Sequence, residues 1–586
     1  MRKLSLLLAA AAALSIVTPA VAGPAEDFHA LMNDYWATYL KDNPIGATFT
    51  GVTTYDREMG KFTLAEFDRQ AGEAAAFLAR MDKIAPAQLS AADQANYAIL
   101  HRLLSDAVEQ NKFGERQILY SSNGSFHQFL ASLGEQQPFH NYADYDNYLA
   151  RIAQLPEAMG NIASISAKGA REGYVQPCVT LGNVENSITG AIAADPAKSR
   201  FYTPFAGAKP GTVTDAQWAD LQARARDVIA TKVNPAYQNW ATVYHNEVAP
   251  KCRNSIAVSA MPQGKKYYAF LVRQQTTTNL TPEQIHQLGM SEVARIRAEM
   301  DKVAHDAGYP SREAMIARMR TDPKYFAKTP DELMAAAALM AKTIDGKMPT
   351  LFGRLPRLPY GVRAIPLAEA EGNTTAYYVN GSPDAGTAGT YFVNTTHLDQ
   401  RPLWELPALT AHEAVPGHHN QISLQQELDM PTWRRYNAFF TAYVEGWGLY
   451  SEHLGIELGL YDTPEKNMGR LSYEMWRACR LVVDTGIHAK GWTKEQAVAF
   501  MKENTALTDA NIDAEVNRYI STPGQALAYK LGELKIRELR AKAEKELGPK
   551  FDVRRFHDAV LGQGSVPLDA LEAQIDAWIA SEKARS

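Results

Sequence analysis

Residues 412–419 read His-Glu-Ala-Val-Pro-Gly-His-His, a stretch that places imidazoles and a carboxylate close enough together to hold a metal ion. A catalytic zinc needs three protein ligands, one open position for water, and a base beside that water. His412 would donate one imidazole as a ligand. Glu413 would point to the other side of the backbone and take the proton from the water. The stretch therefore predicts a metal centre that hydrolyses its substrate.

The spacing within this stretch departs from the familiar H-E-x-x-H motif, whose two histidines lie one helical turn apart on one face. The position one turn after His412 is taken by Pro416. A straight helix would turn His418 about 120° away from His412, and would bring His419 into line about two turns further on. Pro416 and Gly417 allow a distorted backbone, because proline removes a donor and glycine tolerates unusual dihedral angles. We therefore expect an interrupted helix, with His418 or His419 as the second ligand.

The third ligand is predicted to be Glu445, which lies in the sequence Tyr-Val-Glu-Gly-Trp-Gly at residues 443–448. Two consecutive helices, predicted over residues 406–428 and 433–458, would face each other across the ion. The short link at residues 430–431 favours an antiparallel pair. A histidine pair near a proline is also typical of a plain helix end, so the metal hypothesis depends on this downstream carboxylate.

The His-Glu-x-x-Pro-Gly-His-His and Glu-Gly-Trp motifs of this chain resemble those of a bacterial family of predicted zinc metallopeptidases, domain of unknown function 885. The resemblance also covers residues 377–394, 480–488 and 519–532. It implies a mainly α, zincin-like fold related to helical oligopeptidases such as the thimet oligopeptidase and Taq carboxypeptidase families. A Gly-His pair ends the shorter motif of those families. Gly417-His418 takes that place here, so the resemblance favours His418 over His419.

A small β-element is predicted next to the metal helix, over residues 376–394, which are rich in Tyr, Thr, Asn and Gly. Alternation over residues 390–393 indicates a strand with one buried face. In the zinc peptidases that such a fold resembles, an edge strand ahead of the metal helix pairs with the extended substrate. A hairpin without any role in binding is the alternative.

Most of the remaining chain is predicted to be helical. Apolar residues recur at helical spacing over residues 26–40, and Asn43-Pro44 then ends the run. Residues 269–273 are instead typical of a strand. Further helices are expected over residues 87–112, 145–168, 215–249 and 282–308.

The chain has 586 residues, of which 46% are hydrophobic, so it can bury a large core and is long enough for two or more lobes. We expect an N-terminal helical lobe over residues 23–258, which would narrow access to the site, and a catalytic lobe over residues 259–586. The formal net charge of -5 is small for this length. It gives no sign of a nucleic-acid-binding surface or of a polybasic membrane-binding patch.

Residues 1–22 are typical of a secretory signal peptide. Arg2 and Lys3 precede an apolar run over residues 4–17, and Ala-Val-Ala follows at residues 20–22. The run is too short to span a bilayer comfortably, and signal peptidase accepts this small-residue ending. We expect cleavage after Ala22, no lipid anchor because no cysteine stands at the cleavage point, and no later membrane span. The mature protein would be periplasmic or secreted.

Three cysteines are too few for a disulfide framework, and at most one bridge can form. Cys178 and Cys252 could pair in an oxidising periplasm. Cys479 lies among apolar and arginine residues on a predicted helix and is expected to be a buried thiol. Pairing cannot be read from sequence, so the bridge remains open at this point.

Further residues could assist catalysis. Asp484 and His488 lie one helical turn apart on a predicted helix, so the carboxylate could orient the imidazole toward the transition state. Tyr519 and Tyr529 flank a break between helices at residues 521–525, and either phenol could stabilise an oxyanion near the zinc. A structural hydrogen bond for His488, and core packing for either tyrosine, are the alternatives.

Other charged residues could support the site from its surroundings. An arginine could bind a substrate's terminal carboxylate as a bidentate pair, although a surface salt bridge is the ordinary role of a single arginine. The candidates are Arg477, Arg480 and Arg518. A carboxylate could accept a hydrogen bond from a ligand histidine, as zinc sites generally arrange. The candidates for that role are Glu452, Glu474 and Asp484.

These observations predict an exported, mainly α zinc metallopeptidase that hydrolyses peptides. Zinc would be held by His412, His418 and Glu445, and Glu413 would activate the water. One alternative keeps the metal but cleaves a non-peptide amide or ester. Another is a non-catalytic periplasmic metal-binding protein, which has no need of a base at Glu413. The sequence leaves the peptide's length, the end that is attacked and the oligomeric state open.

Overall fold

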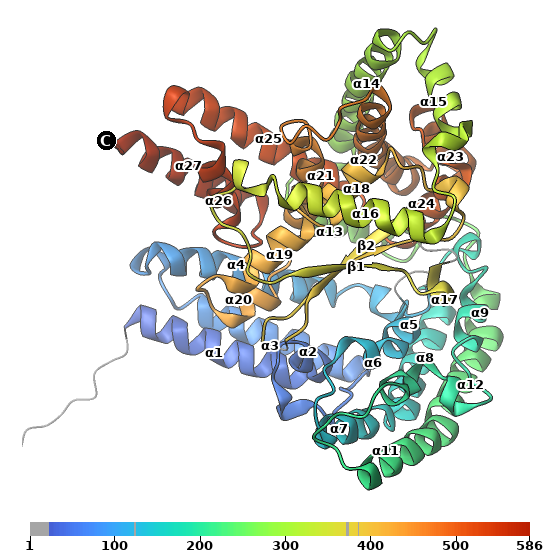
Figure 1. Cartoon of the computed structure of the whole chain (residues 1–586). Coiled ribbons are helices and arrows are strands. Elements are labelled where there is room, and N and C mark those ends of the chain that lie inside the picture. The colour runs from blue at the N-terminus through green and yellow to red at the C-terminus, as the bar shows by residue number, and fades with distance from the viewer. Residues whose placement is uncertain (1–22, 122–124, 371–373, 385, 586) are drawn as a thin grey trace, which may run out of the picture.

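The computed structural model describes residues 23–121, 125–370, 374–384 and 386–585. The predicted signal peptide at residues 1–22 lies outside this part of the chain. The described part of the chain is 69% helical and contains a small three-stranded sheet, which confirms the predicted mainly α fold. Figure 1 shows the sheet near the centre of the molecule, with helices around it. None of the described helices has the length and apolar character that crossing a bilayer requires.

The N-terminal helices each bury one face. The predicted helix over residues 26–40 is α1 (Pro24–Asp42), which buries Phe28, Leu31 and Tyr35 at helical spacing and ends before the next proline. The longer helices that follow are α3 (Leu64–Met81), α4 (Ala91–Gln110), α7 (Tyr142–Ile152), α8 (Leu155–Arg171), α11 (Asp215–Val228) and α12 (Asn234–Val243).

One local prediction is wrong. Residues 269–273, for which the sequence indicates a strand, lie within the helix α13 (Gly264–Thr276). Tyr267, Phe270 and Leu271 are buried at helical spacing in this segment. Burial of that face outweighs the preference of aromatic residues for strands, because tertiary packing routinely overrides local propensity.

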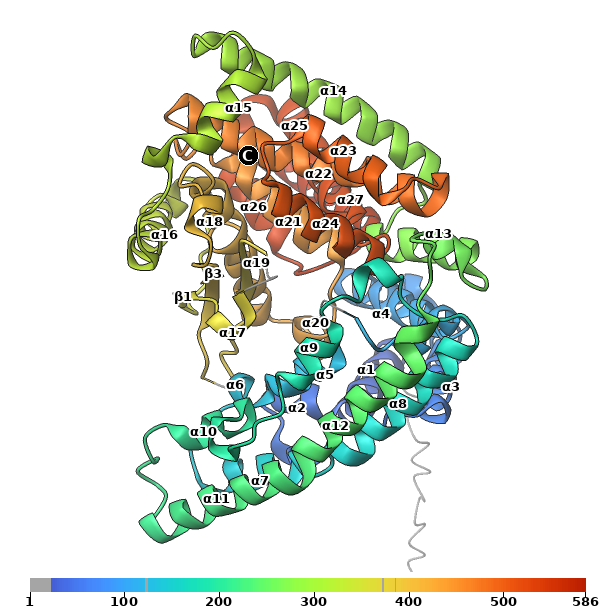
Figure 2. The same cartoon turned by 90° about the vertical axis from the view of Figure 1, so that its right-hand side faces the viewer.

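The C-terminal helices surround the metal motif. α14 (Pro282–Asp306) packs along α22 (Pro464–Lys490), and α21 (Thr441–Leu454) packs along α25 (Leu527–Leu547). In Figure 2 these four helices lie in the upper half of the molecule, whereas α7, α8, α11 and α12 lie in the lower half. The other long helices here are α16 (Pro330–Asp345), α23 (Lys494–Asn504), α24 (Asp509–Ser521), α26 (Val553–Leu561) and α27 (Leu568–Ala584).

The sheet lies beside the metal helix α18 (Leu406–Glu413). Its strands are β1 (Tyr360–Ala364), β2 (Ala376–Val379) and β3 (Gly389–Val393), in the order β1-β3-β2. β3 pairs in parallel with β1 and antiparallel with β2, so β2 is an edge strand. Tyr391 of β3 is buried in a core that also contains residues of α18. This arrangement confirms the predicted β-element next to the metal helix.

Hydrophobic clusters connect the two halves of the chain. One cluster, from Ile45 to Val248, belongs to the N-terminal helices alone. A second cluster joins α1, α3 and α4 to the C-terminal helices, for example through Tyr35 and Trp433, whose ring centres lie 6.0 Å apart. The first helices therefore share a core with the last ones. A division of the chain after residue 258 stays a prediction.

Cys178 and Cys252 form the disulfide that the sequence left open. Their Cα atoms lie 4.9 Å apart, and 74 positions separate them in the chain. Beside the bridge, the amide of Cys178 donates to the carbonyl of Arg253, and the amide of Arg253 donates to the carbonyl of Gln176. Cys479 is a buried free thiol, as predicted. The bridge ties the segment after α8 to the segment before α13.

Replacing both bridge cysteines by serine should lower the free energy of unfolding by about 2–4 kcal/mol, because the cross-link restricts a long loop of the unfolded chain. Urea unfolding of the C178S/C252S variant and of the unchanged protein would measure the difference. Dithiothreitol should destabilise the unchanged protein and leave the variant as it was. Equal unfolding midpoints without reductant would contradict a stabilising bridge.

Candidate metal centre

The helix that carries the motif breaks after Glu413. α18 ends at this residue, and α19 (His418–Glu427) begins after a short loop. A Cβ atom on Gly417 would lie 1.8 Å from the carbonyl oxygen of His412, so only glycine fits this close turn. The predicted interruption is therefore present, as a loop between two helices and not as a bulge within one.

α21 lies close against this loop. The indole Nε1 of Trp447 donates a hydrogen bond of 2.8 Å to the carbonyl oxygen of Pro416, which follows a cis peptide bond. A Cβ atom on Gly448 would approach the imidazole of His412 to 2.8 Å, so glycine here lets α21 reach the ring. Neither contact was predicted from the sequence. Glycine inside a predicted helix was the available signal, since such a glycine often has a packing reason.

His412, His418 and Glu445 come together at the break. Their ligand atoms all lie within 4.8 Å of one another. Oε2 of Glu445 lies 3.5 Å from Nε2 of His412 and 3.4 Å from Nε2 of His418. Tetrahedral ligands with bonds of about 2.0–2.1 Å to zinc would be spaced about 3.4 Å apart. The three side chains therefore fit a shared metal ion.

The environment of Glu445 also fits a cation. Its Oε2 atom is buried and has no hydrogen-bond partner among the described residues. Such a carboxylate is costly to bury, and a bound cation would remove that cost. Burial raises the pKa of Glu445, but His412 and His418 outweigh burial and hold the pKa well below its usual range. Burial lowers the pKa of His412, whereas Glu445 and Glu452 raise it, to about 9.

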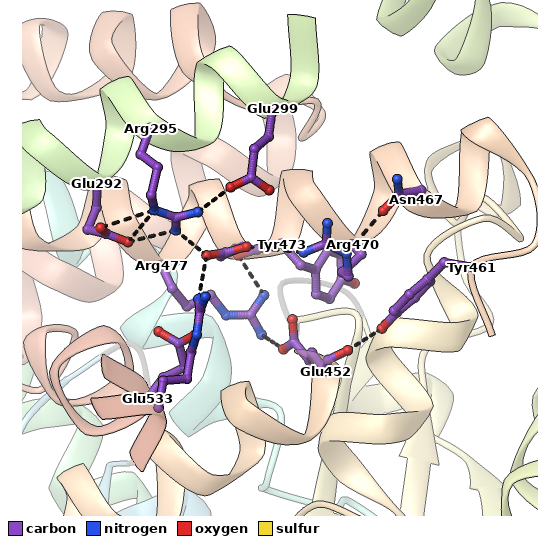
Figure 3. Close-up of polar contacts among 12 residues, drawn as sticks. Glu292, Arg295, Glu299, Glu452, Tyr461, Asn467, Arg470, Tyr473, Arg477 and Glu533 are labelled. Atoms are coloured by element: carbon purple, nitrogen blue, oxygen red, sulfur yellow. Dashed lines mark hydrogen bonds and ion pairs between the residues drawn. The ribbon is translucent and has the colours of Figure 1, made fainter. Parts of the chain in front are cut away.

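Glu452, which lies on α21, supports His412. Its Oε1 atom lies 2.8 Å from Nδ1 of His412, which leaves Nε2 of that ring to face the metal position. Arg477 of α22 lies 3.1 Å from the same oxygen, and the hydroxyl of Tyr461 donates to the backbone carbonyl of Glu452. Figure 3 shows Arg477 and Tyr461 converging on Glu452. A carboxylate in this place fixes the orientation of a ligand histidine.

The other two predicted supporting carboxylates have partners elsewhere. Glu474 belongs to a buried ion network and lies 2.9 Å from Nζ of Lys530. Asp484 accepts hydrogen bonds from the hydroxyl of Tyr268 and from the backbone amide of Gly524. Within the described chain, Glu452 is thus the one of the three that contacts a ligand histidine.

His419, the alternative second ligand, faces the sheet. Its Nδ1 atom shares hydrogen bonds with the hydroxyls of Tyr378 on β2, at 2.9 Å, and of Ser423, at 3.2 Å. Its ring centre lies 4.5 Å from that of Tyr360 on β1. The structure thus brings His418, and not His419, to the other ligands.

Glu413 occupies a more open position than its neighbours. It is the last residue of α18 and is partly exposed, while the rest of the motif is buried. It lies near Tyr391 of β3, whose pKa is raised by burial and further by this carboxylate. A carboxylate that adjoins a ligand and reaches solvent can exchange protons with water. The placement is compatible with a general base.

The two candidate phenols have different surroundings. The ring of Tyr529 on α25 lies 6.3 Å from the ring of His412 and is nearly parallel to it, at 19°. The hydroxyl of Tyr519 on α24 is buried and accepts hydrogen bonds from Nε1 of Trp476, at 2.8 Å, and Nε of Arg480, at 3.0 Å. Of the two, it is Tyr529 that neighbours a metal ligand.

His488 is a structural residue in this fold. It is fully buried, and burial lowers its pKa to about 4, so the ring is neutral. Its Nδ1 atom accepts from the amide of Val258, and its Nε2 atom lies 3.0 Å from the carbonyl oxygen of Tyr519. The expected hydrogen bond from His488 to Asp484 is therefore not formed, because both ring nitrogens have backbone partners. Neither nitrogen is left for a substrate.

Comparison with known proteins identifies a family. The model of the family described as "Bacterial protein of unknown function (DUF885)" matches residues 44–575. No curated protein matches the chain.

Solved structures were compared as well. A candidate lipoprotein from Colwellia psychrerythraea is 28% identical, with a TM-score of 0.90 over 96% of this chain and 100% of its own. A candidate lipoprotein of unknown function from Shewanella oneidensis is 19% identical, with a TM-score of 0.69 over 94% of this chain and 99% of its own. Pyrococcus furiosus carboxypeptidase, at 11% identity and a TM-score of 0.36 over 95% of this chain and 99% of its own, is too distant to support a conclusion. The family match spans most of the sequence, and this chain therefore belongs to the bacterial family DUF885.

Proposed function

We propose that this protein is an exported zinc-dependent peptidase. The observation that carries the proposal is the spacing of His412, His418 and Glu445, whose donor atoms surround one position at the distances a shared ion requires. Two imidazoles and one carboxylate are a common ligand set of catalytic zinc, and they leave a fourth position open. Glu413 directly follows the first ligand, where a hydrolase needs its base.

Each residue of the site would have a separate role in hydrolysis. Zinc, when bound, would lower the pKa of a water molecule and polarise the carbonyl group of the scissile bond. Glu413 would accept the proton of the attacking water and pass it to the leaving amine. Glu452 would hold the ring of His412 in place, and Arg477 would balance the charge of Glu452.

Tyr529 would stabilise the oxyanion that develops as the carbonyl is attacked. Its phenolic oxygen accepts hydrogen bonds from Nη2 of Arg518, at 3.0 Å, and Nε2 of Gln525, at 3.3 Å. Because these donors occupy the acceptor positions of the oxygen, its own proton must point away from them. No described residue receives that proton. A phenol held in this way beside His412 is a suitable donor to an oxyanion.

The edge strand β2 supports a peptide as the substrate. β2 pairs with β3 on one side, and no described strand pairs with its other side. Tyr378 of β2 contacts His419, the residue after a proposed ligand, so the strand lies beside the site. An extended chain can add to such an edge through backbone hydrogen bonds, which tolerate many sequences. A small amide or ester would make no use of this edge.

Export is supported by three observations. The relatives from Colwellia psychrerythraea and Shewanella oneidensis are described as candidate lipoproteins. The Cys178–Cys252 bridge is typical of oxidising compartments. Residues 1–22 have the pattern of a signal peptide. A lipid anchor is not part of the proposal, because residue 23 is glycine and not cysteine.

Changing Glu413 to glutamine should greatly slow hydrolysis while the metal stays bound, because the amide cannot accept a proton but leaves the ligands intact. We expect the rate to fall by about 10²- to 10⁴-fold. The mature protein and its E413Q variant would be incubated with a mixed peptide library, with and without a chelator, and the cuts identified by mass spectrometry. The metal content of both proteins would be measured by plasma mass spectrometry. A rate in E413Q close to that of the unchanged protein would exclude this mechanism.

The same experiment separates the alternatives. Chelator-sensitive cuts in peptides support the peptidase. Activity confined to small amides or esters would favour an amidase or esterase that keeps the same metal site. Bound metal without any hydrolysis, in both the unchanged protein and E413Q, would favour a metal-binding protein.

Changing Glu452 to glutamine should weaken zinc binding by about 10- to 100-fold, because the ligand His412 loses its anionic partner. Competition with a chromophoric chelator would measure the affinity. The matched control is E457Q, since Glu457 pairs with Arg540 at 2.6 Å and not with a ligand histidine. An unchanged affinity in E452Q, or an equal loss in E457Q, would contradict the supporting role of Glu452.

A further inference from the structure

A cluster of charged side chains lies in contact with Tyr529. Arg480 of α22 and Arg518 of α24 share one carboxylate, Glu515, at 2.9 Å and 3.6 Å. The guanidinium carbon of Arg480 lies 4.2 Å from the centre of the Tyr529 ring. Nη2 of Arg518 donates to the phenolic oxygen at 3.0 Å. The cluster therefore adjoins the phenol that neighbours the ligand His412.

The cluster has a net positive charge. Its two guanidinium groups face a single carboxylate, and Glu515 is fully buried. Burial raises the pKa of Glu515, but the positive charges of Arg480 and Arg518 lower this pKa by more, so the carboxylate stays ionised. Nη1 of Arg480 is buried and has no hydrogen-bond partner in the described part of the chain. An unmatched guanidinium in such a place favours an anionic ligand.

Arg518 is the member of the cluster that a ligand can reach. Its side chain is 27% exposed, whereas that of Arg480 is 2% exposed. Arg477, the third candidate from the sequence, is 5% exposed and is paired with Glu452. Arg480 thus contributes buried positive charge, and Arg518 presents a guanidinium at the surface of the cluster.

We propose that Arg518, supported by the charge of Arg480, binds the free α-carboxylate of a peptide substrate, so that the enzyme acts at the carboxyl ends of peptides. The inference rests on the proposed peptidase function and names its substrate class. A guanidinium matches a carboxylate with two parallel hydrogen bonds. Nη2 of Arg518 also donates to Oε1 of Gln525 at 3.1 Å, so the carboxylate would replace this amide oxygen as an acceptor. A phosphate or an internal acidic side chain would be the same in a peptide acid and in its amide, so the comparison below responds to the chain end alone.

A carboxylate bound by Arg518 would lie close to the scissile bond. The rings of His412 and Tyr529 are 6.3 Å apart, and Arg518 lies 3.0 Å from the phenolic oxygen. An extended chain advances about 3.3–3.6 Å per residue. These contacts span only a few residues of an extended chain, so the carboxylate that Arg518 receives would belong to a residue close to the bond that is cut.

The test must separate binding of a carboxylate from support of Tyr529, because Arg518 also contacts that phenol. The deciding quantity is a ratio of kcat/KM values. It compares a short peptide that has a free C-terminal carboxylate with the same peptide carrying a C-terminal amide. Loss of Tyr529 support alone would lower both rates and leave the ratio unchanged. Loss of a carboxylate site would lower the ratio itself.

The unchanged protein should prefer the free acid by roughly tenfold to a hundredfold, the usual contribution of a hydrogen bond to a charged group. The R518Q variant should bring the ratio close to unity. R518K should keep an intermediate ratio, because lysine retains the charge without the planar pair of donors. R554Q is the matched control, since Arg554 is exposed on α26, and its ratio should equal that of the unchanged protein. Acetylation of the peptide's amino end should have no effect on the ratio.

Binding provides a readout that does not need turnover. Isothermal titration of zinc-loaded E413Q should show tighter binding of the free acid than of the amide, by roughly tenfold. The double variant E413Q/R518Q should lose this difference. Thermal unfolding would confirm that each variant is folded. If R518Q is not folded, the comparison would be made with R518K.

The outcomes distinguish this proposal from the proposed function. Equal cleavage of acid and amide by the unchanged protein would overturn the carboxyl-end proposal and leave the peptidase intact. A preference that persists in R518Q, with or without a fall in both rates, would overturn the role of Arg518. If no peptide is cleaved, the proposed function fails. A preference of E413Q for the free acid would still support the carboxylate site in that case, and equal binding would overturn it.

Discussion

The arrangement of this protein depends on one buried negative charge. Glu445 lies between the imidazoles of His412 and His418, with an oxygen that no described donor satisfies. Burying a carboxylate costs several kcal/mol unless a positive charge accompanies it. Against the effect of burial, Glu445 and Glu452 raise the pKa of His412, so a protonated imidazole is one way to compensate the charge. A divalent ion is the other solution, and its binding would release that proton.

The grouping of ligands could be predicted from the sequence because its chemistry is local. His412, Glu413 and His418 fall within one short stretch, and Glu445 lies on the next long helix. Pro416 and the following glycine signalled the break in the helix before any coordinates were known. The choice between the two adjacent histidines needed more, because it depends on how the close turn at Gly417 rotates the chain. The resemblance to known peptidases supplied that choice.

The supporting residues could not be predicted in the same way, because their partners come from distant segments. Asp484 and His488 have the spacing of a helical pair, but each finds a partner on another element, Tyr268 for one and Val258 for the other. Glu452 and Glu474 are equivalent in the sequence. Only the packing of α21 against α18 places Glu452 beside His412, and the packing of α22 against α25 places Glu474 beside Lys530. Pairwise patterns name the possible partners, whereas tertiary packing selects among them.

Helix α22 connects the proposed metal site to the arginine cluster. Arg477 and Arg480 lie about one helical turn apart, so both project from one side of the helix. The indole of Trp476 adjoins both guanidinium groups, with 4.2 Å from its ring centre to Arg477 and 4.6 Å to Arg480. Arg477 pairs with Glu452 beside the metal position, and Arg480 pairs with Glu515 in the cluster. One rigid helix holds both pairs, so helical geometry fixes the distance between the proposed hydrolytic centre and the excess positive charge. A substrate bound at both points would need a defined length between its reacting carbonyl and its charged end.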